Sequence, residues 1–238
     1  MRIFTPKFGK TALLLFCAVL SFGRARAGAV QLSLPMQSMN GDHMVVRSWE
    51  DMKFTSTVHQ KYDFSCGSAA LATLLTYVYH VPVTESAIFK SMYEHGNQAR
   101  IRRMGFSLLD MKSYLARHGV PSDGYKASLS VLAKLRVPAI ALIDYRGYHH
   151  FVLIRGINAG QVLISDPSLG LRTESIPAFE HQWSGIFFAI TTDLSQARIA
   201  FNSPSVWQAV PEPPIRMARF QIHNLDLPAN GWQALNAF

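Results

Sequence analysis

The apolar residues of this chain follow a helical period before Pro138 and a strand-like pattern after it. Between residues 66 and 79, small and apolar side chains recur at helical spacing, which predicts a helix that begins at Cys66. After Pro138, short apolar or β-branched runs alternate with tight turns, and these runs are AIALIDY, HHFVLIRG, QVLISD and IFFAITT. Helices first and antiparallel strands afterwards, in one core, predict an α+β domain in which N-terminal helices pack on an antiparallel sheet.

Three more helices are predicted between this helix and the first strand. Their ranges are 84–94, 108–117 and 130–135. Ser107 and Asp110 fit a capping box in front of the second of them. The basic run Arg100, Arg102 and Arg103 precedes that helix. We interpret this run as a solvated loop, and the alternative is a rim that receives an acidic partner or substrate segment.

The first 27 residues have the pattern of a secretory signal peptide. Basic residues precede an apolar run of 12 residues from Thr11 to Phe22, and Ala25-Arg26-Ala27 follows it. Such a run is short for a bilayer-spanning helix, and the alternative interpretation is a short N-terminal anchor. We therefore predict export to the periplasm and a mature chain with no integral membrane segment.

Signal removal changes what the net charge and the cysteines indicate. The formal charge of +8 at first suggests a nucleic-acid binder. Five of the 23 Lys and Arg residues, and none of the 15 Asp and Glu residues, lie in the signal peptide, so the mature chain carries 18 − 15 = +3. We expect no nucleic-acid partner. Cys17 leaves with the signal peptide, and the remaining thiol, Cys66, needs an explanation in an oxidising compartment.

The remaining segments flank a domain that we place at residues 55–193. The lead-in at 28–54 alternates weakly, and one or two short strands are expected in it. Residues 194–238 are rich in Pro and lack a clean periodicity. This segment is expected to be disordered, or extended along the domain or a partner.

Cys66 is the residue around which a catalytic site can be built. A lone cysteine is commonly a small buried hydrophobe, but a helix N-terminus stabilises a thiolate. His149 and His150 follow one another on a predicted strand, so one of them at most can point at the cysteine. Asp166 ends the next strand and could accept from the histidine, and Gln60 could form an oxyanion hole with the Cys66 N–H.

The residues around Cys66 resemble a known family signature. The segment Gln60–Ala69, QKYDFSCGSA, is similar to the Q-x(5)-C-G-x-A pattern of the C39 peptidases, papain-like domains that remove double-glycine leader peptides from exported peptides. The similarity continues through GFSLL, PAI, HFVL and DP, over roughly residues 55–192. One departure is Ser65, since the family commonly has Asp before the cysteine.

This resemblance implies a papain-like cysteine peptidase with a defined set of site residues. In it, Cys66 is the nucleophile, His150 the general base, Asp166 the orienting residue and Gln60 the oxyanion-hole donor. His149 is then a neighbour on the opposite face, and Asp63 a structural acceptor. Neither a cofactor nor a metal ion is implied.

The layout of the chain narrows the expected function. An exported C39-like chain with a Pro-rich tail is similar to the proteases encoded with functional-amyloid secretion systems. It implies cleavage after small residues such as Gly-Gly in an exported protein or peptide, with secretion-system or amyloid components as further partners. The alternatives are a non-hydrolytic C39-like module that binds a substrate, and a transferase or ligase on the same scaffold.

Overall fold

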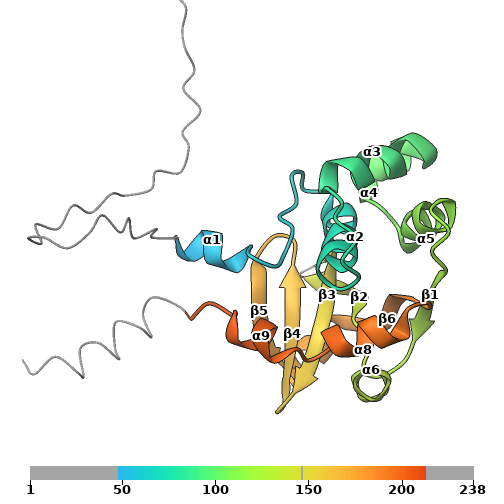
Figure 1. Ribbon diagram of the computed structural model, residues 1–238. Helices are drawn as coiled ribbons and strands as arrows, with labels where there is room; N and C mark the ends of the chain where they lie inside the picture. The colour runs from blue at the N-terminus through green and yellow to red at the C-terminus, as the bar shows by residue number, and fades with distance from the viewer. Residues whose placement is uncertain (1–47, 146, 213–238) are drawn as a thin grey trace, which may run out of the picture. The chain divides into compact units, whose positions relative to one another are not determined.

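The structure, a computed structural model, describes residues 48–145 and 147–212 and consists of helices packed on one six-stranded sheet (Figure 1). The predicted signal peptide and most of the predicted lead-in lie outside these residues. The strand order is β1-β6-β2-β3-β4-β5, and every neighbouring pair is antiparallel. The predicted α+β class, with helices on an antiparallel sheet, is therefore confirmed.

Helices precede most of the sheet, and their caps explain where they begin. Their bounds are α1 Trp49–Lys53, α2 Cys66–Tyr77, α3 Glu85–His95, α4 Gln98–Met104, α5 Leu108–Arg117 and α6 Leu129–Leu135. The Thr84 side chain accepts from the Ala87 N–H at the start of α3. Ser107 and Asp110 form the predicted capping box of α5. The four predicted helices, which correspond to α2, α3, α5 and α6, are confirmed to within two residues at each end.

Alternating side chains along the strands bury both faces of the sheet. The strands are β1 Ser122–Lys126, β2 Ala139–Tyr145, β3 Tyr148–Asn158, β4 Gln161–Asp166, β5 Gly170–Ser175 and β6 Trp183–Ile190. Ile140, Leu153 and Phe188 pack in one apolar cluster with α2, α3 and α5. Their chain neighbours, such as Val152 and Phe187, pack in a second cluster with α6, with α7 (Ile176–Gln182) and with α8 (Leu194–Ala200).

The basic run before α5 is helical, so its interpretation as a solvated loop is wrong. The Asn97 side chain accepts from the Arg100 N–H and caps α4, and Ile101 is fully buried in the helical layer. One apolar anchor and one cap are therefore enough to order a segment whose other side chains are mostly polar. Likewise, the end of the lead-in forms α1 where short strands were expected, and Ser48 caps this helix with a capping box.

The described part of the C-terminal segment also differs from the prediction. In place of a disordered or extended segment, residues 194–208 form α8 and α9, the latter spanning Pro204–Gln208. Ala197 and Phe201 are buried, and the Asn202 N–H donates to the Arg155 carbonyl on β3. Burial of these few side chains on the sheet orders a segment that lacks a strong helical period. The rest of the segment, from residue 213, lies outside the described residues.

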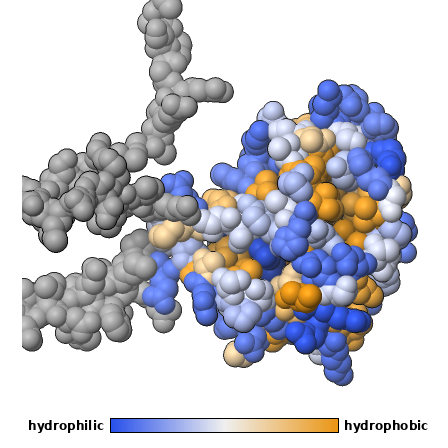
Figure 2. Space-filling model, viewed as in Figure 1, coloured by the Kyte–Doolittle hydropathy of each residue, from blue (hydrophilic) through white to orange (hydrophobic). Residues whose placement is uncertain are grey.

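The surface of the described residues carries both apolar and hydrophilic side chains. Figure 2 shows apolar side chains in patches among hydrophilic ones on one face of the molecule. Among the described residues, none of the helices has the length and apolar character needed to cross a bilayer.

Candidate active site

Cys66 is the first residue of α2, where the backbone N–H groups of the helix have no side-chain cap. The preceding Ser65 hydroxyl instead accepts from the Tyr62 N–H at 3.1 Å and donates to the Tyr62 carbonyl at 3.0 Å. The N-terminal end of α2 therefore keeps its favourable field for a negative charge at Cys66. Cys66 is 4% exposed. Gly67 lets α2 approach α5 closely, because a Cβ there would lie 2.8 Å from Met111 Cε.

The His150 ring joins Cys66 to Asp166. His150 Nε2 lies 2.8 Å from Asp166 Oδ1, and the two side chains are 8% and 2% exposed. Cys66 lies close enough to the ring for its side chain to raise the pKa of His150. Because Nε2 is occupied by Asp166, Nδ1 is the ring nitrogen that is left for the thiol. The structure thus brings together three of the four sequence-predicted site residues, with His150 hydrogen-bonded to Asp166 and close to Cys66.

Charge pairing outweighs burial in setting the protonation states of His150 and Asp166. Burial alone lowers the pKa of His150, but the hydrogen bonds and charges of Asp166 and Cys66 outweigh it and raise that pKa to about 9. Burial alone would raise the pKa of Asp166, but the hydrogen bond and charge of His150, followed by the charge of Arg172, hold it well below its ordinary range. The favoured state at neutral pH is therefore a carboxylate beside an imidazolium.

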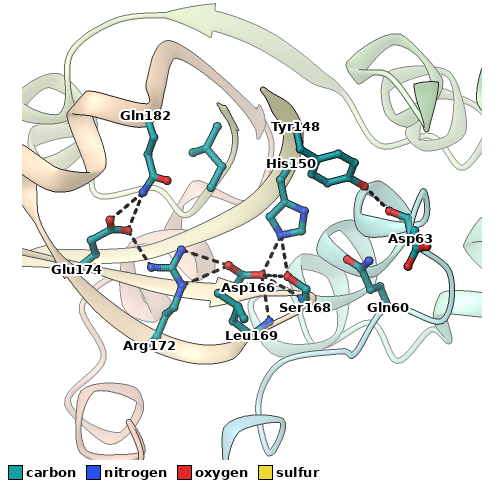
Figure 3. Close-up of a pocket in the computed structure, with 11 residues that line it drawn as sticks. Gln60, Asp63, Tyr148, His150, Asp166, Ser168, Leu169, Arg172, Glu174 and Gln182 are labelled. Atoms are coloured by element: carbon teal, nitrogen blue, oxygen red, sulfur yellow. Dashed lines mark hydrogen bonds and ion pairs between the residues drawn. The ribbon is translucent and has the colours of Figure 1, made fainter. Parts of the chain in front are cut away.

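A network of donors holds the Asp166 carboxylate in place (Figure 3). Oδ1 accepts from the Ser168 N–H at 3.0 Å, from the Ser168 hydroxyl at 2.9 Å and from the Leu169 N–H at 3.2 Å. Oδ2 accepts from Arg172 Nε at 3.2 Å. Arg172 is itself paired with Glu174 at 2.8 Å, and Gln182 donates to Glu174. With both oxygens occupied, the carboxylate has one orientation toward the His150 ring.

Gln60 lines the same cavity as His150 and Asp166. Its backbone N–H donates to the Pro167 carbonyl at 3.0 Å, which ties it to the turn after Asp166. The side-chain Nε2 donates to the Tyr62 carbonyl at 3.1 Å. An amide nitrogen carries two hydrogens, so one donor remains for a second acceptor. Oε1 is buried with no partner among the described residues, and the role of Gln60 as an oxyanion-hole donor stays a prediction.

His149 lies apart from the group formed by Cys66, His150 and Asp166. Its side chain is 69% exposed, and Nδ1 lies 4.0 Å from Asp144 Oδ2 on β2. Alternation along β3 thus separates the two histidines, and His150 is the buried one of the pair. Asp63, expected to be a structural acceptor, accepts through its backbone carbonyl from the Tyr148 hydroxyl.

Sequence reasoning missed several residues of the site, among them Ser168, Arg172 and Tyr148. Arg172 and Glu174 stand two residues apart, so on a strand they share one face, and this spacing was a signal in the sequence. The strand β5 was not predicted, however, because its sequence, GLRTES, is mostly polar. Tyr148 stands two residues before His150 and therefore shares its face of β3. Its position is a second signal that strand alternation could have supplied.

Two cavities adjoin at the site, since Tyr148 and Asp63 line both of them, and we call them the two halves of the cleft. Cys66 lines one half, and Gln60, His150 and Asp166 line the other. Burial, followed by the negative charges of Cys66 and Asp63, raises the pKa of Tyr148 above its ordinary value, so its hydroxyl keeps the proton that it donates. In the described part of the chain, no cluster of three or more His, Cys, Asp or Glu side chains could hold a metal ion.

Two curated proteins are similar to this chain in sequence. Two proteins described as "Probable functional amyloid protease FapD", from Pseudomonas aeruginosa and Pseudomonas fluorescens, are 40% and 41% identical to this chain over 145 residues. Each match covers 61% of this chain and 64% of the relative, so the chain spans less than two thirds of the length of these relatives. The layout of the chain predicted this relationship.

A solved structure shares the fold. The peptidase domain of Streptococcus ComA, described as a bi-functional ABC transporter involved in a quorum-sensing pathway, matches with a TM-score of 0.50 at 19% identity, over 57% of this chain and 96% of that one. The family model named peptidase C39 matches residues 55–195. From the match over these residues, we conclude that the chain belongs to the peptidase C39 family.

Proposed function

We propose that this protein is a cysteine peptidase that acts through Cys66. The observation that carries the proposal is the buried hydrogen bond between His150 and Asp166, with Cys66 close to the same ring. A nucleophile, a base and a group that orients the base are the three parts that acyl transfer requires. Their order along the chain is the one that the family resemblance implies.

Each residue has one role in the proposed cycle. The Cys66 thiolate attacks the scissile carbonyl, while the Cys66 N–H and the Gln60 amide donate to the oxyanion. The protonated His150 ring then gives its proton to the leaving amine, and the C–N bond breaks. In the second half, His150 accepts a proton from water, which attacks the thioester and releases the acyl product and the thiol. Asp166 fixes the tautomer and orientation of the ring throughout.

We infer that the substrate is an exported protein or peptide, cleaved after small residues such as Gly-Gly. The signal-peptide pattern of residues 1–27 supports a periplasmic location. The printed name of the two relatives supports a component of a functional amyloid as the partner. A domain spanning residues 55–193 carries the proposed activity, and this range lies within the family match.

Thiol reactivity tests the proposal most directly. In the full chain with Cys17→Ser, Cys66 is the one remaining thiol. An ordinary thiol is less than about 1% ionised at pH 6, so we expect iodoacetamide to label this protein at pH 6 at least about tenfold faster than the same protein unfolded in urea. His150→Gln should remove this advantage, and His149→Gln is the matched control that should keep it. Labelling at the rate of an ordinary thiol would refute the peptidase.

Product analysis separates hydrolysis from the alternatives. A Gly-Gly-containing peptide incubated with the protein should give two fragments by mass spectrometry, and Cys66→Ala should give none. A product joined to an added amine would instead indicate a transferase. Peptide binding without cleavage by a protein whose Cys66 labels slowly would indicate the non-hydrolytic module.

A further inference from the structure

The half of the cleft that holds Cys66 has a basic wall, which the proposed function does not use. This wall is formed by α4, from which Arg100, Arg102 and Arg103 line the same cavity as Cys66. Tyr148, His149 and other residues of β2 and β3 also line this cavity. The three arginines are thus placed where a peptide bound at the cysteine would pass.

The backbone holds this wall against the segment that carries the nucleophile. Gly105, which ends α4, has φ 74°, and a Cβ at this residue would lie 3.3 Å from the Phe64 carbonyl oxygen. Phe64 stands two residues before Cys66. A glycine is required for both the positive φ and the close approach. The basic end of α4 is therefore fixed relative to Cys66 and does not lie on a separate loop.

Two of the three arginines keep their charge available. Arg100 forms an ion pair with Asp110, which leaves its charge largely compensated. Arg102 is exposed and donates to the Tyr93 hydroxyl, a neutral partner. Arg103 is exposed and makes no hydrogen bond or ion pair with the residues that the structure describes. No carboxylate among those residues pairs with either Arg102 or Arg103.

Charge differs between the two halves of the cleft. The half around Cys66 contains one carboxylate, Asp63, against the three arginines. The other half contains Asp63, Asp166 and Glu174 against one arginine, Arg172. A peptide that crosses both halves therefore meets a positive potential on the α4 side of the cysteine. On the other side it meets no net positive charge. Apolar side chains, including Met104 and Leu142, complete the wall of the basic half.

We propose that Arg102 and Arg103 select a substrate that carries an acidic side chain within a few residues of the scissile bond, on the side of it that lies against α4. This inference rests on the proposed function, since it assumes that a peptide occupies the cleft at Cys66. A carboxylate in this position completes the charge pairing that the protein itself leaves open. The small residues expected at the cleavage site fit beside the buried cysteine. The acidic residue distinguishes this substrate from other peptides with small residues.

Peptide binding to an inactive protein tests the proposal. The protein is the full chain with Cys17→Ser and Cys66→Ala, and the probes are fluorescent ten-residue peptides with a central Gly-Gly in a Ser and Ala background. One Glu is placed at each other position in turn, on both sides of Gly-Gly, and compared with Gln by fluorescence anisotropy. Exposed ion pairs are individually weak, so we expect Glu to bind about three- to tenfold tighter than Gln at one position.

Charge variants identify the source of the preference. Arg102→Gln and Arg103→Gln should each reduce it, and the double variant should abolish it. Arg198→Gln is the matched control, because Arg198 is exposed on α8 and lines a different cavity. Raising the salt concentration from 0.05 to 0.5 M should also weaken the preference, since screening acts on exposed charges.

The outcomes separate this proposal from the peptidase itself. Equal binding of all Glu and Gln peptides, no binding by any of them, or a preference that survives in the double arginine variant overturns the acidic selection. If the preference is found but Cys66 labels as an ordinary thiol, the selection stands and the peptidase fails. If Cys66 is reactive but Glu is not preferred, the peptidase stands alone.

Discussion

The pairing of His150 with Asp166 gives the stability of this protein a defined dependence on pH. The ordinary pKa of 6.5 rises to about 9 in the folded state. At about 1.4 kcal/mol per pH unit, this difference corresponds to about 3 kcal/mol of folding free energy. Because the pKa is raised by folding, the contribution is fully present below pH 6.5 and is lost as the pH rises from 6.5 through 9.

Asp166→Asn removes the charge that produces most of this effect and keeps the shape of the side chain. Both arms of the comparison carry Cys66→Ser, so that titration of the thiol does not enter. Without the Cys66 hydrogen bond and charge, the contribution of Asp166 is smaller than the full value, and we expect about 1–3 kcal/mol. The protein that keeps Asp166 should lose this free energy between pH 6.5 and 9, and the Asp166→Asn protein should not.

Urea denaturation at half-unit steps from pH 6 to 9.5 measures this difference. All titratable groups distant from Asp166 are common to both proteins, so their contributions cancel in the subtraction. A direct reading of the His150 titration by NMR in the same two proteins gives an independent check. If the two stability curves stay parallel within about 0.5 kcal/mol from pH 6 to 9.5, the charge pairing of His150 with Asp166 is refuted.

Three further substitutions test other parts of the structure. Arg172→Met should lower the unfolding free energy at pH 6 by about 1 kcal/mol, since one donor of the buried Asp166 is lost. Asp166 has its pKa lowered by folding, so this deficit should shrink as the pH falls below about 4 in acid titrations followed by circular dichroism. Phe201→Ala should cost about 3–5 kcal/mol in urea denaturation, and a cost below about 1 kcal/mol would show that α8 is not part of the core. Tyr148→Phe should speed labelling of Cys66 by iodoacetamide roughly two- to tenfold, because the bond to Asp63 across the cleft is lost, and an unchanged rate would show that this contact does not limit access.

Local sequence signals predicted four of the helices, α2, α3, α5 and α6, and the central strands, because these elements bury a periodic set of side chains. The capping box of Ser107 and Asp110 and the apolar spacing of α2 are independent of the rest of the chain. By contrast, β1 is an edge strand whose residues are mostly exposed, and its sequence, SDGYK, has no apolar alternation. Its pairing with β6 decides its conformation, and such a tertiary effect cannot be inferred from the five residues of the strand alone.

The same distinction applies to the candidate site. Cys66, His150, Asp166 and Gln60 could be named because each stands in a recognisable local motif. Arg172 could not, because its role depends on the register that places β5 beside Asp166. Arg102 and Arg103 were noticed as a charge run, but their position beside the cysteine depends on the packing of α4 against the segment that ends at Phe64.

The hydrogen bond from the Gln60 N–H to the Pro167 carbonyl has a consequence for how the protein acquires its site during folding. It joins residues more than a hundred positions apart, and the contact between His150 and Cys66 joins two others more than eighty apart. Contacts of such high sequence separation form only after long loops have closed. A chain that is still emerging or only partly folded therefore carries an ordinary thiol, and we expect the reactive cysteine to appear in the last, cooperative step of folding.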